Sequence, residues 1–439
     1  MNIYNIIDKK RHNEVLTKEE IEYFVINYTN GSIPDYQASA LLMAIAINGM
    51  TDAEISYLTM AMASSGNRID LSKVIGPTID KHSSGGVGDK TTLIISPIIA
   101  CLGGYVAKMS GRSLGYTGGT IDKLESIGMK VNLTDEEFIK QVNEIGLAII
   151  SQTVNIAPAD KKIYALRDVT ATVDSIPLIA SSIMSKKIAG SSSNLVLDVK
   201  VGSGAFMKDV NTATKLGQKM LEIGKMSGLD VKVVLTNMDM PLGNNIGNAL
   251  EVKEAMEILQ NKGPEDLKEV SICLATYMNM LVNKLNYETS YKQVIEVLEN
   301  GSAYNKFKEW VSYQGGKLEF TESNYKYEVV SQKEGYITHM DTENIGKISS
   351  LLGSGRLSKD DVINYNAGIV LNYKTGDYVK QGDVLAILHT DKENVSDLIK
   401  LYLDSIIISN EKPNEIKMIL NVIEWLSIVF ENVSKKTKH

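Results

Sequence analysis

The stretch DKHSSGGVGDKTT, from Asp80 to Thr92, follows a short apolar run and leads into a helical pattern. A second stretch with the same features, AKMSGRSLGYTGGTID, runs from Ala107 to Asp122. Glycine has no Cβ, so several backbone amides of such a loop can point to one place, and the following helix adds the positive end of its dipole. Lysines and hydroxyls suited to phosphate oxygens lie among the glycines: Lys81, Ser83, Thr92, Lys108, Ser110 and Thr120. The two stretches therefore predict a socket for an anion, and phosphate fits it best.

Other uses of a glycine loop fit less well. The first stretch is not a Walker A sequence, because no Gly-Lys-Ser/Thr closes it. The run Gly85-Gly86-Val87-Gly88 also lacks the glycine spacing of a dinucleotide fingerprint. The alternative that the glycines only form turns stays open at this point.

The overall composition limits the class of protein. A chain of 439 residues is too long for one ordinary core, so two or three domains are expected. The net charge of −7 argues against nucleic acid as a partner. Cys101 and Cys273 each lie in an apolar run, and we expect two buried thiols rather than a disulfide framework or a zinc site. No signal sequence or membrane span is recognisable, so a cytoplasmic protein without a membrane partner is expected.

The pattern of elements changes along the chain. Residues 1 to about 65 read as helices, with capping boxes at Thr17–Glu20 and Thr51–Glu54. From residue 78 strands, glycine loops and helices alternate, which predicts a largely parallel sheet with helices on its faces. The segment 160–190 is helical, interrupts this alternation and is expected to pack on the N-terminal helices. Short strands set off by Gly-Asp turns begin near residue 330 and indicate a separate α+β unit.

Polar residues of the segment 160–190 form a second candidate group. Tyr164 and Arg167 lie close together in the sequence, and Ser182 and Lys186 are four residues apart, on one face of a helix. Ile179 and Ile183 are expected to point inward on that helix, so Ser182 and Lys186 would flank the apolar stripe and could line a cleft. A purely solvated helix face is the alternative.

Four longer motifs carry a resemblance to a known family. They are KMSGRSLGYTGGTIDKLE from Lys108 to Glu125, KHSSGGVGD from Lys81 to Asp89, the run from YALRDVTATVD at Tyr164 on to Lys187, and LDVKVGSGAFM from Leu197 to Met207. Over nearly its whole length the chain resembles the thymidine and pyrimidine-nucleoside phosphorylases. Relatives usually carry glycine where this chain has Ser113 and histidine where it has Tyr116.

The resemblance implies an α/β fold with a small all-helical domain, a larger α/β domain with a mixed sheet, and a C-terminal α+β (hammerhead-like) unit. We assign residues 1–65 and 160–192 to the helical domain on the nucleoside side, 70–159 and 193–330 to the α/β domain on the phosphate side, and 331–439 to the C-terminal unit. The implied reaction is reversible phosphorolysis of a pyrimidine nucleoside to free base and pentose 1-phosphate. Members of the family are homodimers and use no organic cofactor, with inorganic phosphate as co-substrate.

Site residues carry over by position. Phosphate-binding positions match Lys81, His82, Ser83, Thr92, Lys108, Met109, Ser110 and Thr120. Positions that hold the nucleoside match Tyr164, Arg167, Ser182, Lys186 and Leu114. The resemblance gives His82, Arg167 and Lys186 catalytic roles, with His82 near the leaving base. Some members also bind a potassium ion, at positions that match Gly88, Lys90, Leu242, Asn245 and Glu254; residue 90 is commonly threonine in those relatives.

The chemistry of these side chains agrees with such a reaction. Cleavage of an N-glycosidic bond puts negative charge on the departing base, which Arg167 and Lys186 can stabilise. Phosphate is itself the nucleophile, so the enzyme must hold it near the sugar and exclude water. A hinge at residues 66–76 would let the domains close. In the family, lysine at position 108 goes with broad specificity, so uridine, deoxyuridine and thymidine are all expected substrates.

Three alternatives remain. A thymidine-specific phosphorylase is the nearest. A phosphoribosyltransferase of related fold would need acidic Mg²⁺ ligands near the phosphate loops, where Asp122 and Glu125 fit an outward helix face or a salt bridge better. A lipoyl or biotinyl carrier would need a lysine in a characteristic hairpin context, which neither Lys374 nor Lys380 has.

Overall fold

The computed structural model describes residues 1–113, 116, 118–152, 155–356 and 361–424. Within these residues the largest sheet has six strands in the order β13-β5-β4-β1-β2-β3, and only β13 runs antiparallel to its neighbour. The largely parallel sheet that the sequence pattern predicts, and the mixed sheet that the family resemblance implies, are therefore confirmed. The strands are β1 (Thr78–Ser83), β2 (Tyr105–Ser110), β3 (Leu147–Ser151), β4 (Asn194–Val201), β5 (Asp230–Asn237) and β13 (Ile419–Ile423).

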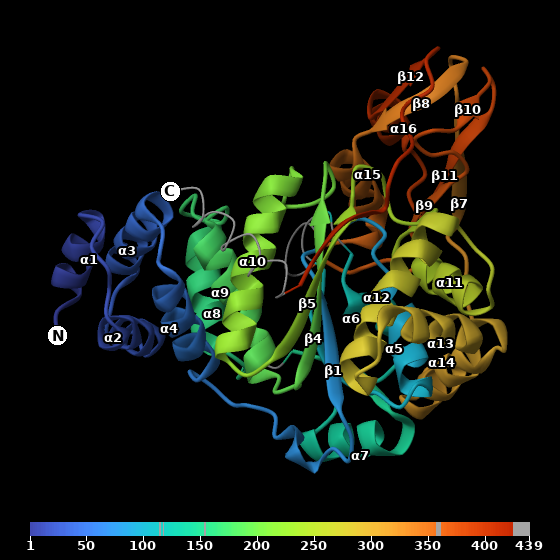
Figure 1. The fold of residues 1–439 in the computed structure, drawn as a ribbon. Coiled ribbons are helices and arrows are strands. Elements are labelled where there is room, and N and C mark those ends of the chain that lie inside the picture. The colour runs from blue at the N-terminus through green and yellow to red at the C-terminus, as the bar shows by residue number, and fades with distance from the viewer. Residues whose placement is uncertain (114–115, 117, 153–154, 357–360, 425–439) are drawn as a thin grey trace, which may run out of the picture.

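Helices cover both faces of this sheet (Figure 1). All eight residues of the central strand β4 are buried, as expected for a parallel strand with helices on both sides. Successive side chains of β4 alternate between two cores, Val196 lying in one and Leu195 and Leu197 in the other. One face carries α5 (Thr91–Cys101), α11 (Asn248–Leu259), α12 (Glu265–Asn283), α13 (Tyr287–Glu299) and α14 (Ser302–Tyr313). The other carries α7 (Asp135–Ile145) and α10 (Val210–Met226), and the short α6 (Thr120–Glu125) follows β2.

The N-terminal helices form a third core together with a segment from the middle of the chain. Ala159 and Ile163 of α8 and Leu178 of α9 are buried in the same cluster as the apolar residues of the first helices. Figure 1 shows α8 and α9 beside α4, between the N-terminal helices and α10. The capping boxes at Thr17 and Thr51 are present as predicted. The helices are α1 (Ile3–Arg11), α2 (Lys18–Thr29), α3 (Asp35–Asn48), α4 (Asp52–Ala63), α8 (Pro158–Asp168) and α9 (Ile176–Ala189), and a 3-10 turn (Leu71–Lys73) follows α4.

The C-terminal part contains smaller antiparallel sheets. One has the order β10-β8-β12 and the other β6-β9-β11-β7. The strands of these two sheets are β6 (Asn245–Ile246), which precedes the C-terminal part in the sequence, β7 (Tyr325–Val330), β8 (Gly335–Met340), β9 (Gly368–Leu371), β10 (Tyr378–Val379), β11 (Val384–Thr390) and β12 (Ile406–Ser409). The C-terminal part also contains α15 (Thr342–Ser349), a π-helical turn (Ser350–Ser354) and α16 (Ser396–Asp404).

Two details differ from the sequence analysis. The last strand, β13, lies within the range assigned to the C-terminal unit but pairs with β5 of the large sheet. It covers an edge that β5 would otherwise expose to solvent. Cys273 is buried as expected, whereas Cys101, at the end of α5, is only partly buried.

Candidate active site

Two adjoining cavities lie at the carboxyl ends of the strands of the large sheet, among the described residues. Ligands of open α/β sheets bind at this edge, because loops and helix N-termini converge there. The larger cavity has a volume of about 280 Å³ and the smaller one of about 170 Å³. His82, Ser83 and Gly85, at the end of β1, line both cavities. The cavities therefore meet at His82.

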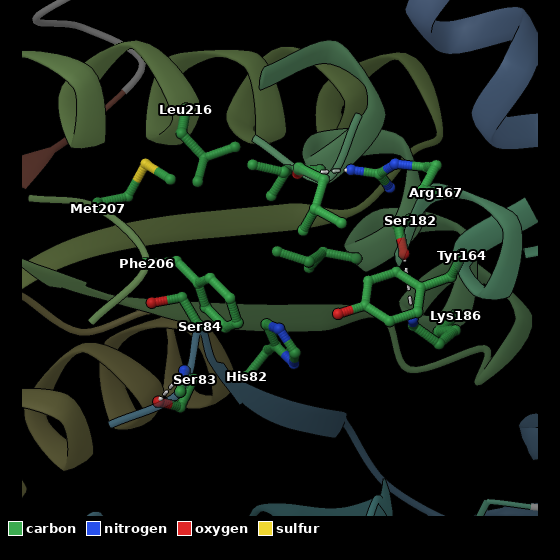
Figure 2. A pocket seen from close by; sticks show the side chains of 14 residues that line it. His82, Ser83, Ser84, Tyr164, Arg167, Ser182, Lys186, Phe206, Met207 and Leu216 are labelled. Carbon is green, nitrogen blue, oxygen red and sulfur yellow. Dashed lines mark hydrogen bonds between the residues drawn. The ribbon is translucent and has the colours of Figure 1, made fainter. Parts of the chain in front are cut away.

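The larger cavity is mostly apolar and has a polar end (Figure 2). Tyr164 and Arg167 from α8 and Ser182 and Lys186 from α9 supply the polar groups, so the structure brings these four sequence-predicted residues together. The apolar lining consists of Val173, Ile179, Ile183, Phe206, Met207 and Leu216. Figure 2 shows Tyr164 on the side of Arg167, Ser182 and Lys186, and Phe206 on the side of Met207 and Ser84. Leu114, the remaining predicted nucleoside residue, lies outside the described residues.

The orientation of α9 differs in part from the prediction. Ile179 and Ile183 are only partly buried: they pack against a hydrophobic core, as predicted, and they also line the cavity. Leu178 and Met184 fill the cores. Because α9 packs against α4 and α10 on other sides, its apolar stripe is wide enough to serve both the core and the cavity wall.

Arg167 holds the segment between α8 and α9. Its guanidinium is almost completely buried, with 1% of the residue exposed, and burial lowers its pKa. Nη2 donates to the carbonyl of Val173 at 2.8 Å, Nη1 to that of Leu178 at 3.0 Å and Nε to that of Thr172 at 3.2 Å. Arg167 thus shapes the wall of the cavity as well as lining it.

Lys186 and Ser182 form a polar pair on α9. The Lys186 ammonium lies 3.3 Å from Ser182 Oγ and 2.7 Å from Asp160 Oδ2. Asp160 is buried, and its Oδ1 has no hydrogen-bond partner among the described residues. Since an unpaired buried carboxylate oxygen is costly, the group is suited to accept a further donor.

The smaller cavity is polar and cationic. It is lined by most of the predicted phosphate residues, namely His82, Ser83, Thr92, Lys108, Met109, Ser110 and Thr120. The sequence analysis missed Lys187, which also lines it. Asp80 connects the two lysines, because its Oδ1 lies 3.0 Å from Lys108 Nζ and its Oδ2 lies 2.8 Å from Lys187 Nζ. Two ammonium groups with one shared carboxylate leave a net positive charge beside the cavity.

Lys81 is the predicted phosphate residue that lines neither cavity. Strand β1 continues through Ser83, and side chains of a strand alternate between its faces. The Lys81 ammonium therefore points away from Asp80 and lies 3.0 Å from Asp198 Oδ2 and 2.7 Å from Thr91 Oγ1. In this arrangement Lys81 orders the base of the loop rather than facing the cavity.

Burial and the neighbouring lysines lower the pKa values of Lys108 and His82. Burial, together with the charge of Lys187, lowers the pKa of Lys108 to about 8, although Asp80 opposes the shift. Desolvation lowers the pKa of His82 well below its usual value, and the charges of Lys187, Lys108 and Lys186 lower it further. His82 is therefore a neutral imidazole near pH 7.

The residues matched to a potassium site come together, but around an ammonium group. Lys90 Nζ donates to the carbonyls of Asn245 at 2.7 Å and Leu242 at 2.9 Å and to the carboxylate of Glu254. Gly88 packs directly against Leu242. Because Lys90 already uses the oxygens that would bind an ion, the residues present do not fit a separate potassium ion.

Ser113 and Tyr116, the two motif positions at which this chain differs from most relatives, lie outside the apolar cavity, and so do the acidic residues Asp122 and Glu125. Ser113 lines the polar cavity, and Tyr116 lines neither. Asp122 is buried and pairs with Arg356 at 2.8 Å, so the expectation of an outward face is wrong for it and that of a salt bridge is confirmed. Glu125 pairs with Arg112. Both carboxylates are thus paired with arginines, of which Arg112 also lines the polar cavity.

Two of the three site residues that the sequence analysis missed, Asp80 and Lys187, could have been found from the sequence. Asp80 directly follows Ile79 in the short strand before the first glycine loop, and a charged residue that is buried in a strand normally requires a partner. Lys187 follows Lys186 in a motif that was already singled out. Nothing in the sequence indicates that Asp160, more than twenty residues before Lys186, is its partner.

Family models match most of the chain. The helical bundle domain of a glycosyl transferase family matches residues 4–66, the a/b domain of that family matches residues 75–304, and the pyrimidine nucleoside phosphorylase C-terminal domain matches residues 336–409. No helix among the described residues is long and apolar enough to cross a lipid bilayer.

Similar proteins cover almost the full length. A pyrimidine-nucleoside phosphorylase of Staphylococcus haemolyticus (strain JCSC1435) is 51% identical over 415 residues, which are 92% of this chain and 96% of that protein. One of Staphylococcus aureus (strain N315) is 48% identical over 419 residues, 93% of this chain and 97% of that protein. The solved structure of anthranilate phosphoribosyltransferase (TrpD) from Thermus thermophilus has a similar fold, with a TM-score of 0.58 at 18% identity over 71% of this chain and 99% of that one. The chain belongs to the pyrimidine-nucleoside phosphorylase family of glycosyl transferases.

Proposed function

We propose that this enzyme catalyses the reversible phosphorolysis of pyrimidine nucleosides to free base and (deoxy)ribose 1-phosphate. One observation carries the proposal: a cationic polar cavity and an apolar cavity with a polar end adjoin at His82. The pairing suits a reaction between a small dianion and a flat heterocycle joined to a sugar. The sugar would lie at the junction, where phosphate can approach C1′.

The polar cavity supplies what phosphate binding needs. Lys108 and Lys187 provide charge, while Ser83, Thr92 and Ser110 provide hydroxyl donors. The start of α5, at Thr91, adds the positive end of a helix dipole. A phosphate oxygen attacks C1′ as the N-glycosidic bond breaks, and the bonding electron pair leaves with N1 of the base.

The apolar cavity supplies what the base needs. Its aliphatic and aromatic walls match a pyrimidine ring, and Arg167, Ser182 and Lys186 lie at its polar end. Cationic donors there stabilise the negative charge that develops on O2 and O4 of the departing base. These groups also exclude water once the two sides close on the substrate.

His82 lines both cavities, and its lowered pKa makes the imidazole neutral near pH 7. Burial and four lysine charges lower its pKa. A bound phosphate dianion would offset those charges and favour the imidazolium. We propose that His82 becomes a proton donor to the base after phosphate binds.

We propose uridine, deoxyuridine and thymidine as substrates. Lys108 supports this breadth, since lysine at its position goes with the broader members of the family. The comparison of kcat/KM for uridine and thymidine tests it. Similar values support the proposal, and a thymidine preference of about a thousandfold, more than one methyl group explains, contradicts it.

We also propose a cytoplasmic homodimer. Free thiols at Cys101 and Cys273 suit a reducing compartment. Light scattering of the purified protein tests the assembly, with a mass of twice the chain expected and a monomer contradicting it.

The decisive test of the reaction is its product. Incubation with uridine and phosphate should give ribose 1-phosphate, detected by ³¹P NMR, in amounts equal to the uracil formed. Release of pyrophosphate from a phosphoribosyl donor, with no sugar phosphate made from uridine, would instead support the phosphoribosyltransferase alternative.

A further inference from the structure

The loop between β5 and β6 is built around a buried ammonium group. Lys90 is 1% exposed, and its three N–H donors meet three oxygens: the carbonyls of Leu242 and Asn245 and the carboxylate of Glu254. A shell of carbonyl and carboxylate oxygens is also the shell that a hard metal cation prefers. Here Lys90 uses both carbonyls and one carboxylate oxygen, Oε2 of Glu254.

The carboxylate of Glu254 fixes the same loop from the other side. Its Oε1 accepts from the backbone amides of Asn244 at 2.8 Å and Asn245 at 3.1 Å. Gly243 has φ +73, and a Cβ there would lie 2.3 Å from Glu254 Oε2 and 2.9 Å from Lys90 Nζ. The loop is therefore closed tightly around the ion pair, with no space for a second cation.

A second ion pair supports this loop. Asp266 accepts from the Gly243 amide at 3.0 Å and pairs with Lys374, whose ammonium donates to the Gly243 carbonyl at 3.1 Å. An additional ion would have Lys90 and Lys374 as neighbours, and like charges at short range in a buried site repel strongly.

The position of Lys90 links this loop to the polar cavity. Lys90 is the residue immediately before α5, whose second residue, Thr92, lines that cavity. The Leu242 amide donates to the Val87 carbonyl at 3.1 Å, so the loop is also hydrogen-bonded to the glycine stretch that contains Val87. A cation at this point therefore fixes the shape of the anion-binding loop.

We infer that the ammonium of Lys90 is the built-in cation of this site, in the place of the potassium ion that the family resemblance implies. The enzyme then needs no free monovalent cation for stability or for activity. The activity part rests on the proposed function, whereas the stability part does not.

The first test uses the unmodified enzyme. The thermal midpoint, and the rate of uracil release from uridine, are measured with sodium, potassium or tetramethylammonium as the only monovalent cation at constant ionic strength. Both should be the same in all three. A rise of the midpoint or of the rate that is specific to potassium would overturn the inference.

The second test removes the ammonium. Lys90→Ala leaves the Glu254 carboxylate buried without its partner and opens a space, so the midpoint should fall by about 5 °C or more in tetramethylammonium. Potassium should restore most of this loss, because the vacated oxygens can then bind the ion. Lys90→Met keeps the side-chain volume. Its midpoint should fall as much as that of Lys90→Ala, and potassium should not restore it.

Lys123→Ala is the matched control. Lys123 is also buried, with Glu251 at 2.9 Å and the Asp89 carbonyl at 2.8 Å, but it has no loop of carbonyls around it. Potassium should not restore the stability that Lys123→Ala loses. Equal restoration of Lys90→Ala and Lys123→Ala, or none for Lys90→Ala, would contradict the inference. If Lys90→Ala does not fold in any salt, the comparison of cations with the unmodified enzyme decides.

Discussion

Lys186 and Lys187 are consecutive on α9, yet their ammonium groups bind different carboxylates: Lys186 binds Asp160 at 2.7 Å, and Lys187 binds Asp80 at 2.8 Å. Neighbouring residues of a helix point about 100° apart, which explains the divergence. One lysine lines the apolar cavity and the other the polar cavity. The helix thus contributes one cation to each half of the site.

This divergence predicts different kinetic effects for neighbouring substitutions. Lys186→Met should raise KM for uridine and lower kcat, and Lys187→Met should raise KM for phosphate, each by about tenfold or more, since a charge-assisted hydrogen bond contributes about 1.5–3 kcal/mol. Initial rates over both substrate concentrations measure the effects. Lys140→Met, at an exposed position, is the control. The same KM affected by both variants would contradict the separate roles.

Phosphate binding should weaken at alkaline pH because of Lys108. Its pKa is lowered to about 8, so the ammonium is charged below that pH and becomes neutral above it. KM for phosphate should therefore rise as the pH increases through this range, although phosphate itself is then fully dianionic. Bound phosphate will move the transition upward.

Lys108→Met provides the comparison for this pH dependence. Its KM for phosphate should be high already at neutral pH and should change less above it. An alkaline rise of equal size in Lys108→Met would show that another group is responsible.

Asp80 should matter for stability in a pH-dependent way. Burial alone would raise its pKa, but the charges of Lys108 and Lys187 outweigh burial and lower it. Its contribution to stability is therefore full above the ordinary Asp pKa of about 3.9 and is lost as the pH falls below it. Asp80→Asn leaves two buried ammonium groups without their carboxylate, at a cost of about 3–5 kcal/mol. Thermal midpoints measured against pH should differ between variant and unmodified enzyme near pH 7 and converge in acid. A constant difference across the range would contradict this role.

The pKa of His82 should rise when phosphate binds. Burial and nearby lysines hold its pKa well below the usual value, and a dianion beside it would reverse part of the effect of the lysines. NMR titration of the histidine side chains, with His82→Asn to assign the signal, measures the shift. His82→Asn should also lower kcat. An unchanged pKa with phosphate, together with an unchanged kcat, would remove His82 from the mechanism.

Local rules predicted much of the fold from the sequence. The capping boxes at Thr17 and Thr51 both form, because a hydroxyl and a carboxylate three residues apart satisfy the free amides of a helix start whatever the surroundings. The last strand, Ile419–Ile423, was not predicted as part of the large sheet. Its partner β5 is almost two hundred residues away, and nothing in the local sequence pattern indicates this pairing.

For the candidate site too, features set by local sequence were predicted, and features set by long-range contacts were not. Glycines, lysines and hydroxyls of the two motifs indicated the polar cavity, since their types and spacing carry the chemistry. The direction of Lys81 could not be predicted, because it depends on where strand β1 ends. The contacts of Lys90 with Leu242 and Asn245 depend on a loop that folds back from far along the chain, so the sequence could not show that the Lys90 ammonium uses these carbonyls.

The central claim is that one cavity holds phosphate as the nucleophile for a nucleoside bound in the other. The rate of uracil release from uridine, measured against phosphate concentration, tests it most directly. The account predicts almost no release without phosphate and a rate that saturates as phosphate is added. Release at the same rate in phosphate-free buffer would contradict it.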